Sequence, residues 1–245
     1  MVDHLIQTRS LSVKYDGSRA LEGVDFDCRH GEFVSIVGRS GTGKSSFLNA
    51  LAGFVPFEGE VTIPSSIGYV FHDYALFPWL TVEQNIGFGV LDYPCDERRK
   101  RISEMLERIE MSAFRNRYPR QLSGGQIQRV ALARALAPDP PVLFMDEPYG
   151  ALDYHTRDRM QSWLSHLWQQ TRKTVLFVTH YIDEAIFLAD RVVVVRDKRF
   201  VVDLEVPFAH PRNEDLRFSD RFLDMKHLVL DHMETRPVKI VERCF

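Results

Sequence analysis

The 245-residue sequence has few cysteines and no long hydrophobic run. Its three cysteines, Cys28, Cys95 and Cys244, are far apart and include no C-x-x-C pair, which argues against a zinc or redox site and favours a reducing, cytoplasmic setting. The longest apolar stretches, at 47–57 and 192–195, are far too short to span a bilayer, and the N-terminus lacks the pattern of a secretion signal. We therefore expect any membrane role to depend on a partner.

The sequence also lacks an excess of positive charge. Its 31 Lys and Arg residues are outnumbered by 34 Asp and Glu residues, which gives a formal net charge of -3. A basic run, ERRKR at 97–101, has helical spacing around it and is expected to form a solvated helix face. We expect no nucleic-acid partner, because no overall positive field exists to hold one.

The hydrophobic pattern predicts an α/β fold. Alternating residues at 11–15 and 24–28 indicate two antiparallel strands, and β-branched or apolar runs predict further strands at 32–37, 60–63, 67–71, 142–145, 174–179 and 192–195. Between 73 and 137 the spacing becomes helical. We expect a mostly parallel sheet with an N-terminal antiparallel β subdomain and an all-helical insertion.

A glycine-rich loop carries the first functional motif. Residues 38–45 read GRSGTGKS, which matches G-x-x-x-x-G-K-[ST] between an apolar strand and a helix, the arrangement of a phosphate-binding loop. Backbone N–H groups and the helix N-terminus favour phosphate, Lys44 can reach the terminal phosphates, and the Ser45 hydroxyl can bind Mg²⁺. The candidate ATP-binding residues of this loop are Gly38, Arg39, Ser40, Gly41, Thr42, Gly43, Lys44, Ser45 and Ser46.

Two carboxylates follow a buried strand at 142–147, which reads VLFMDE. Ligands of open parallel sheets bind at the carboxyl ends of strands, so Asp146 can hold Mg²⁺ through water and Glu147 can accept a proton from an attacking water. The alternative is that the two acids only cap the helix that follows. The phosphate loop upstream favours the catalytic interpretation.

Residues 122–126 read LSGGQ and resemble the signature of ATP-binding cassette (ABC) proteins. GALD at 150–153 is similar to the D-loop of that family, His180 after a strand to its switch histidine, and Tyr15 to the aromatic residue that stacks on adenine. The resemblance implies a P-loop ABC ATPase in which His180 and Glu147 are catalytic. Each later motif is weak alone, and their order carries the resemblance.

The resemblance further implies a homodimer. In the family the signature of one subunit completes the ATP site of the other, and one chain holds a single cassette. The residues expected to reach the ATP of the partner subunit, or to link the two sites, are Ser123, Gly124, Gly125, Gln126 and Asp153.

Four segments are expected along the chain. They are the first part of the ATP-binding core (1–72), the helical subdomain with the signature (73–137), the second part of the core (138–206) and a short C-terminal tail (207–245). Apolar positions predicted for a helix in the tail are Phe222, Leu223, Leu228 and Leu230.

Two stretches resemble the ATPase subunits of the nitrate/sulfonate/taurine importer group: 74–89, YALFPWLTVEQNIGFG, and 145–153, MDEPYGALD. Tyr149 replaces the usual Phe. The aromatic segment 74–79 suits the docking of a short helix from a membrane permease, and the alternative is that it only packs the insertion internally. His72 replaces the glutamine that contacts Mg²⁺ in the group, so we assign the metal to Ser45, His72 and Asp146.

These features predict the ATP-hydrolysing subunit of an importer. We expect a homodimer bound to permease subunits at the cytoplasmic face of the inner membrane, with Mg²⁺ as cofactor, a separate solute-binding protein and a small anionic solute. The alternatives are a soluble ABC ATPase that does no transport, and a regulatory cassette that senses nucleotide.

Overall fold

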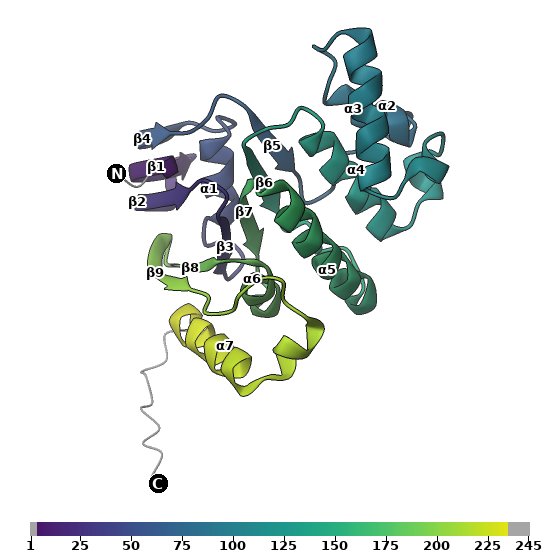
Figure 1. Cartoon of the computed structure of the whole chain (residues 1–245). Coiled ribbons are helices and arrows are strands. Elements are labelled where there is room, and N and C mark those ends of the chain that lie inside the picture. Colours follow the sequence, from purple (N-terminus) through teal and green to yellow (C-terminus); the bar gives the residue numbers. More distant parts are fainter. Residues whose placement is uncertain (1–3, 235–245) are drawn as a thin grey trace. The chain divides into compact units, whose positions relative to one another are not determined.

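The computed structural model describes residues 4–234, and the chain forms two compact units. Unit 1 consists of Met1–Ile63 and Val178–Phe245, and unit 2 of Pro64–Phe177. Figure 1 shows the order of the elements along the chain. The four segments expected from the sequence stay a prediction, and the last part of the tail, 235–245, lies outside the described residues.

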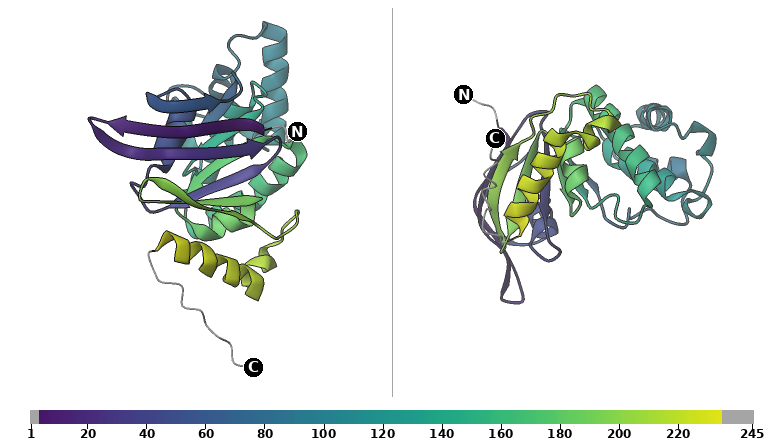
Figure 2. Two further views of the ribbon diagram at one scale, coloured as in Figure 1. Left: turned by 90° about the vertical axis from the view of Figure 1, so that its left-hand side faces the viewer. Right: turned by 90° about the horizontal axis from the view of Figure 1, so that it is seen from below.

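An antiparallel sheet opens unit 1. Its strands β1 (His4–Tyr15), β2 (Ser18–Arg29) and β4 (Phe57–Thr62) are arranged in the order β2-β1-β4. β1 and β2 form a long hairpin (Figure 2) with Leu11 opposite Val24, and both of these side chains are buried. The alternation in the sequence therefore predicts the buried face of this sheet correctly except at Tyr15, which is 42% exposed at the end of β1.

The remaining strands of unit 1 combine parallel and antiparallel pairing. β3 (Phe33–Gly38) is buried along its whole length and pairs in parallel with β8 (Arg191–Arg196). β8 then pairs antiparallel with β9 (Arg199–Glu205), a strand that the sequence analysis did not predict. Helix α1 (Lys44–Leu51) follows β3 through the phosphate loop, and α6 (Ile182–Leu188) precedes β8.

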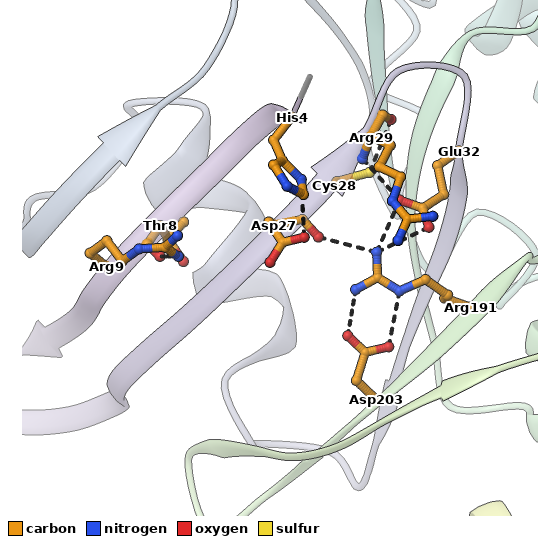
Figure 3. A network of polar contacts seen from close by, with 9 residues as sticks. All are labelled: His4, Thr8, Arg9, Asp27, Cys28, Arg29, Glu32, Arg191 and Asp203. Atoms are coloured by element: carbon orange, nitrogen blue, oxygen red, sulfur yellow. Dashed lines mark hydrogen bonds and ion pairs between the residues drawn. The ribbon is translucent and has the colours of Figure 1, made fainter. Parts of the chain in front are cut away.

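A network around Arg191 joins three segments of unit 1 (Figure 3). The Arg191 guanidinium lies 3.0 Å from both carboxylate oxygens of Glu32, pairs with Asp203 on β9, and donates to the carbonyl oxygen of Asp27 on β2. Burial opposes the charge, but the hydrogen bonds from Arg191 to Asp203 and Glu32 outweigh it and raise the pKa of Arg191. Burial also raises the pKa of the nearby Cys28 thiol, which keeps it protonated.

The C-terminal segment packs on α6 and β8 of the same unit. It contains a short 3₁₀ helix (Glu214–Phe218) and α7 (Asp220–Met233). The predicted helix exists, but its predicted apolar face is wrong in part: Phe222, Met225 and Val229 are buried, whereas Leu223 and Leu228 are exposed. Apolar residues lie all round α7, and the contact with α6 and β8 decides which of them are covered.

Arg212 caps the end of α6. Its guanidinium is 7% exposed and donates to the carbonyl oxygens of Ile186, Phe187 and Ala189, where the helix ends, and also to that of Phe208. Burial lowers the pKa of Arg212 to about 10, against an opposing effect of Asp190, and the side chain remains charged near neutral pH. The cap ties the C-terminal segment to the helix that follows His180.

Unit 2 combines two parallel strands with the helical insertion. β5 (Ile67–Val70) pairs in parallel with β6 (Val142–Asp146), and β6 neighbours β7 (Thr174–Thr179), which carries the chain back to unit 1. The predicted change to helix at 73–137 is confirmed: the segment forms α2 (Val82–Phe88), α3 (Cys95–Arg108), α4 (Gly124–Leu136) and two 3₁₀ turns, Ser112–Phe114 and Pro119–Gln121.

Helix α5 (Tyr154–Thr171) follows β6. The predicted fold class, with mostly parallel strands, an antiparallel β subdomain and an all-helical insertion, is confirmed. Within residues 4–234, no helix is both long enough and apolar enough to cross a lipid bilayer.

Candidate functional site

The phosphate loop of unit 1 has the backbone geometry that its sequence predicts. β3 ends at Gly38 and α1 begins at Lys44, with Gly43 as N-cap at φ 103°. A Cβ on Gly43 would overlap the Ala20 carbonyl oxygen, and one on Gly38 would lie 2.5 Å from the Val195 carbonyl oxygen. Only glycine fits at these two positions, so the motif residues are required for the fold of the loop.

Lys44 lies inside this loop. Its side chain is 4% exposed, and Nζ donates to the carbonyl oxygens of Gly38 at 2.9 Å and Arg39 at 3.0 Å. These bonds hold the ammonium group beside the backbone N–H groups of the loop. Positive charge is thereby concentrated where an anionic phosphate chain fits at the N-terminus of α1.

Two further predicted residues of unit 1 are accessible to solvent. Tyr15 is 42% exposed at the end of β1, and His180 is exposed directly after β7. The turn at His180 is held by Thr179, whose buried hydroxyl donates to Glu184 at 2.6 Å and accepts from the Tyr181 N–H at 3.0 Å. The sequence analysis did not single out Glu184, whose only sequence signal is a carboxylate in the first turn of α6.

The carboxylate pair of unit 2 lies at the end of β6. Asp146 is the last residue of the strand, and Glu147 has a left-handed backbone with φ 44°. The carbonyl oxygen of Glu147 accepts from the Gly150 N–H at 3.1 Å and lies 3.3 Å from Nδ1 of His72. The ring of His72 also leaves no room for a side chain at position 150, because a Cβ on Gly150 would lie 2.8 Å from Cε1 of His72.

Tyr149, which replaces the usual Phe, is accommodated without loss of packing or of hydrogen bonds. Its ring is 1% exposed and packs on Phe177, with 5.8 Å between ring centroids. Its hydroxyl donates to the carbonyl oxygen of Met160 on α5 at 3.3 Å. Because the added hydroxyl has a hydrogen-bond partner, the substitution leaves no buried polar group unsatisfied.

The signature segment starts helix α4. Ser123 is the N-cap: its Oγ accepts from the Gln126 N–H at 3.4 Å, and the Gln126 side chain accepts from the Ser123 N–H at 2.9 Å. A Cβ on Gly124 would lie 2.8 Å from Leu152, and one on Gly125 would lie 3.1 Å from Thr156. The two glycines therefore let the signature pack against the D-loop and the start of α5.

A shallow pocket of about 330 Å³ borders the signature in unit 2, and its lining includes Ser123, Gly125 and Gln126. Asp153 is the N-cap of α5. Hydrogen bonds from Thr156 hold the pKa of the Asp153 carboxyl below its ordinary value. The exposed Ser123 hydroxyl and the adjacent helix N-terminus can bind an anion.

The aromatic segment 74–79 divides into buried and open parts. Tyr74 is buried, which matches the alternative of internal packing, whereas Trp79 is 69% exposed. An open groove of about 440 Å³ is lined by apolar and aromatic residues of unit 2, among them Tyr69, Phe71, Ala75, Phe77 and Phe88. This groove, called the aromatic groove below, has the composition of a surface that binds an apolar helix.

Asn85 fixes the backbone of the segment, and the sequence analysis missed it. Its side chain is fully buried on α2, accepts from the Phe77 N–H at 2.8 Å, and donates to the carbonyl oxygens of Phe77 and Leu80 at 3.2 and 3.0 Å. The only signal in the sequence is a polar residue on the buried face of an amphipathic helix.

The donors assigned to Mg²⁺ differ in chemistry. A hydroxyl on Ser45 and a carboxylate on Asp146 are hard oxygen ligands of the kind that Mg²⁺ takes together with substrate phosphates, so these two fit the metal. The imidazole of His72 is a ligand better suited to Zn²⁺ or Cu²⁺. The roles assigned to individual site residues stay predictions.

Comparison with known proteins gives consistent matches. Residues 21–150 match the family model described as ABC transporter. An aliphatic sulfonates import ATP-binding protein SsuB of Bacillus cereus is 39% identical over 229 residues, covering 88% of this chain and 89% of the relative. SsuB 2 of Rhizobium johnstonii is 43% identical over 219 residues, covering 87% and 86%.

Solved structures of ATP-binding cassettes are also similar to this chain. A dimeric structure of the ATP-binding cassette MJ0796, in a post-hydrolysis state bound to ADP and Pi, has 34% sequence identity and a TM-score of 0.73, covering 83% of this chain and 100% of that one. CbiO1 from Clostridium perfringens, described as part of the ABC transporter complex cbiONQ, has 28% identity and a TM-score of 0.78, covering 93% and 99%. The predicted P-loop ABC ATPase fold is confirmed.

Proposed function

Because the chain belongs to the ABC transporter family, as one of its ATPase subunits, we propose that it energises the import of a small anionic solute through a partner permease. The observation that carries this proposal is the similarity to sulfonate-import ATP-binding proteins, at about 40% identity, over nearly the whole length of both chains. The solute is proposed to be a sulfonate or a related nitrate- or taurine-like anion. The two non-transport alternatives are not favoured.

We propose that the phosphate loop and the carboxylate pair act on one ATP molecule. Residues 38–46 bind its phosphates, with Lys44 as the cationic contact, and Tyr15 stacks on the adenine. Glu147 accepts the proton of the attacking water and His180 contacts the γ-phosphate region. Mg²⁺, held by Ser45 and Asp146 with His72 as the third proposed ligand, supplies charge neutralisation on the phosphate oxygens.

We propose that two copies form a head-to-tail homodimer. The exposed Ser123 and the N-terminus of α4 complete the ATP site of the partner subunit, and Asp153 links the two sites. The dimeric state of the MJ0796 cassette supports this arrangement. ATP binding then closes the dimer and hydrolysis reopens it.

The proposed route to the membrane is the aromatic groove. Phe77 and Phe88 line the groove, and the exposed Trp79 lies beside Phe77 with 5.6 Å between ring centroids, so a short apolar helix of a permease can bury these rings. This places the subunit at the cytoplasmic face of the membrane as a peripheral protein. A separate solute-binding protein is expected to deliver the anion.

Purification from native membranes tests the proposal. Affinity capture of the full chain should bring down a multi-span permease, and a strain without the chain should lose growth on sulfonates as sulfur source while it grows normally on sulfate. Capture of no membrane protein would contradict the transport function. Normal growth on sulfonates would contradict only the proposed solute.

A further inference from the structure

Arg134 connects the signature helix to the segment that follows His72. It lies on α4, eleven positions after Ser123, or roughly 16 Å along the helix axis. Its Nη1 donates to the carbonyl oxygen of Ala75 at 2.6 Å, and its Nη2 to that of Tyr74 at 2.9 Å. A planar guanidinium can donate two parallel hydrogen bonds to adjacent carbonyl oxygens. A lysine ammonium group does not offer this geometry.

The two carbonyl groups belong to strained residues. Tyr74 has φ 62° and Ala75 has φ 45°, a left-handed conformation that non-glycine residues adopt only when their surroundings hold them. Tyr74 is anchored by its buried ring and by its N–H, which donates to Phe71. Arg134 supplies the contact to both carbonyl oxygens, and so it stabilises this backbone shape.

Arg134 also borders the aromatic groove. Its guanidinium carbon lies 5.8 Å from the centroid of the Phe77 ring, and Ala75, Phe77 and Arg134 all line the groove. The side chain is half-buried, and burial lowers the pKa of Arg134 against an opposing effect of Asp73. One cation therefore contacts the strained backbone and the docking surface together.

We propose that Arg134 is a positioning residue that makes segment 74–77 follow α4, so that a displacement at the signature end of the helix reaches the aromatic groove. An α-helix with its backbone bonds intact moves as a rod, and Arg134 is bonded to the far end of that rod. The inference rests on the proposed function, because it takes nucleotide at Ser123 as the cause of the displacement.

Hydrogen exchange of the backbone amides at 74–77 measures this coupling. The parent is the full chain with Glu147→Gln, compared with and without Mg-ATP. Arg134→Gln is the test variant, and Arg134→Lys keeps the charge but not the fork. The matched control is Arg101→Gln, because Arg101 also donates to a carbonyl oxygen at the end of α4, that of Ala137 at 3.2 Å, but does not contact segment 74–77.

The expected result is an ATP-dependent change of exchange at 74–77 in the parent and in Arg101→Gln, lost in Arg134→Gln and reduced in Arg134→Lys. Equal ATP-dependent changes in all four proteins would overturn the inference. If Arg134→Gln does not fold, a full response in Arg134→Lys would overturn it equally. A parent that dimerises with ATP yet shows no change at 74–77 contradicts only the coupling, whereas a parent that binds no ATP contradicts the proposed function as well.

Discussion

Nδ1 of His72 lies 3.3 Å from the carbonyl oxygen of Glu147, so a motif position that departs from the related importers contacts the backbone of the proposed catalytic base. The same carbonyl oxygen accepts from Gly150 and closes the turn toward the D-loop. A change at His72 therefore acts on the position of Glu147 as well as on the proposed metal site.

Glu147→Gln should slow ATP hydrolysis by roughly 10²- to 10⁴-fold and leave ATP binding intact, since a positioned general base contributes about that much. Uncleaved ATP should also trap the dimer between the phosphate loop of one subunit and Ser123 of the other. Size measurement with and without Mg-ATP checks this. A monomer in both conditions would count against an ATP site that is shared between two subunits.

His72→Gln should keep or raise the ATPase rate at neutral pH and lower the Mg²⁺ concentration needed for half-maximal activity. A glutamine amide can donate to the Glu147 carbonyl oxygen, and its own oxygen is a harder ligand for Mg²⁺ than imidazole nitrogen. Mg²⁺ titrations of both proteins provide the measurement. Superimposable curves would mean that His72 is not a metal ligand.

Trp79→Asp should abolish permease association and transport while nucleotide binding persists. The side chain is 69% exposed, so the fold tolerates the change, but a carboxylate buried at the docked interface costs about 2–5 kcal/mol in association. A pull-down beside a thermal melt checks both parts. Phe218→Asp, at an aromatic side chain that is 80% exposed and lies far along the chain from segment 74–79, is the matched control and should bind permease normally.

Loss of permease binding together with an early melt of Trp79→Asp would favour internal packing of segment 74–79 instead. Normal binding by a stable Trp79→Asp would contradict docking of the permease at segment 74–79.

Asp190 predicts a pH dependence of stability. Burial acts to raise its pKa, but hydrogen bonds from His210 and from the Phe33 N–H outweigh this and hold the pKa below the ordinary value of 3.8. A carboxyl with a lowered pKa in the folded state stabilises the fold above its unfolded pKa, and this contribution is lost as the pH falls through the folded value.

Asp190→Asn should therefore cost about 1–2 kcal/mol of unfolding free energy near pH 7 and progressively less below about pH 4. Urea unfolding across this range checks the trend, with exposed Asp16→Asn as control. If the difference in unfolding free energy between the parent and Asp190→Asn stays constant down to about pH 2.5, the charge of Asp190 contributes nothing to stability.

Arg191→Ala should destabilise unit 1 by about 3–5 kcal/mol, because it leaves the Glu32 carboxylate, 9% exposed, without its cation. Lys14→Ala breaks an exposed pair with Glu58 and should change stability by less than about 1 kcal/mol. Denaturant unfolding distinguishes the two. Equal losses of unfolding free energy in the two variants would mean that the burial of Glu32 does not determine the effect of removing its partner.

The motifs could be predicted because each lies in one short stretch of chain. The strand, glycine loop and helix around Lys44, and the cap formed by Ser123 and Gln126, depend on neighbours in sequence. Arg134 could not be predicted, since its acceptors are backbone carbonyl oxygens about 60 positions away, and a carbonyl group carries no sequence signal.

β9 was missed for a local reason. The turn before it uses Asp197 and Lys198, both with positive φ, where the usual hairpin signal is Asn-Gly or Asp-Gly. The face of α7 was assigned wrongly in part because Leu223 and Leu228 are as apolar as the buried Met225 and Val229. Only the tertiary contacts of the helix choose between them.

The cap that Arg212 forms on α6 bears on how the protein can be engineered. A chain shortened after residue 206 would keep every nucleotide motif but would lose the donors to the carbonyl oxygens of Ile186, Phe187 and Ala189. Those groups face the protein interior, so the end of α6 would fray and the turn that presents His180 would loosen with it. Affinity tags and fusion partners therefore belong beyond α7, and the turn that presents His180 depends on a segment that contains none of the family's motifs.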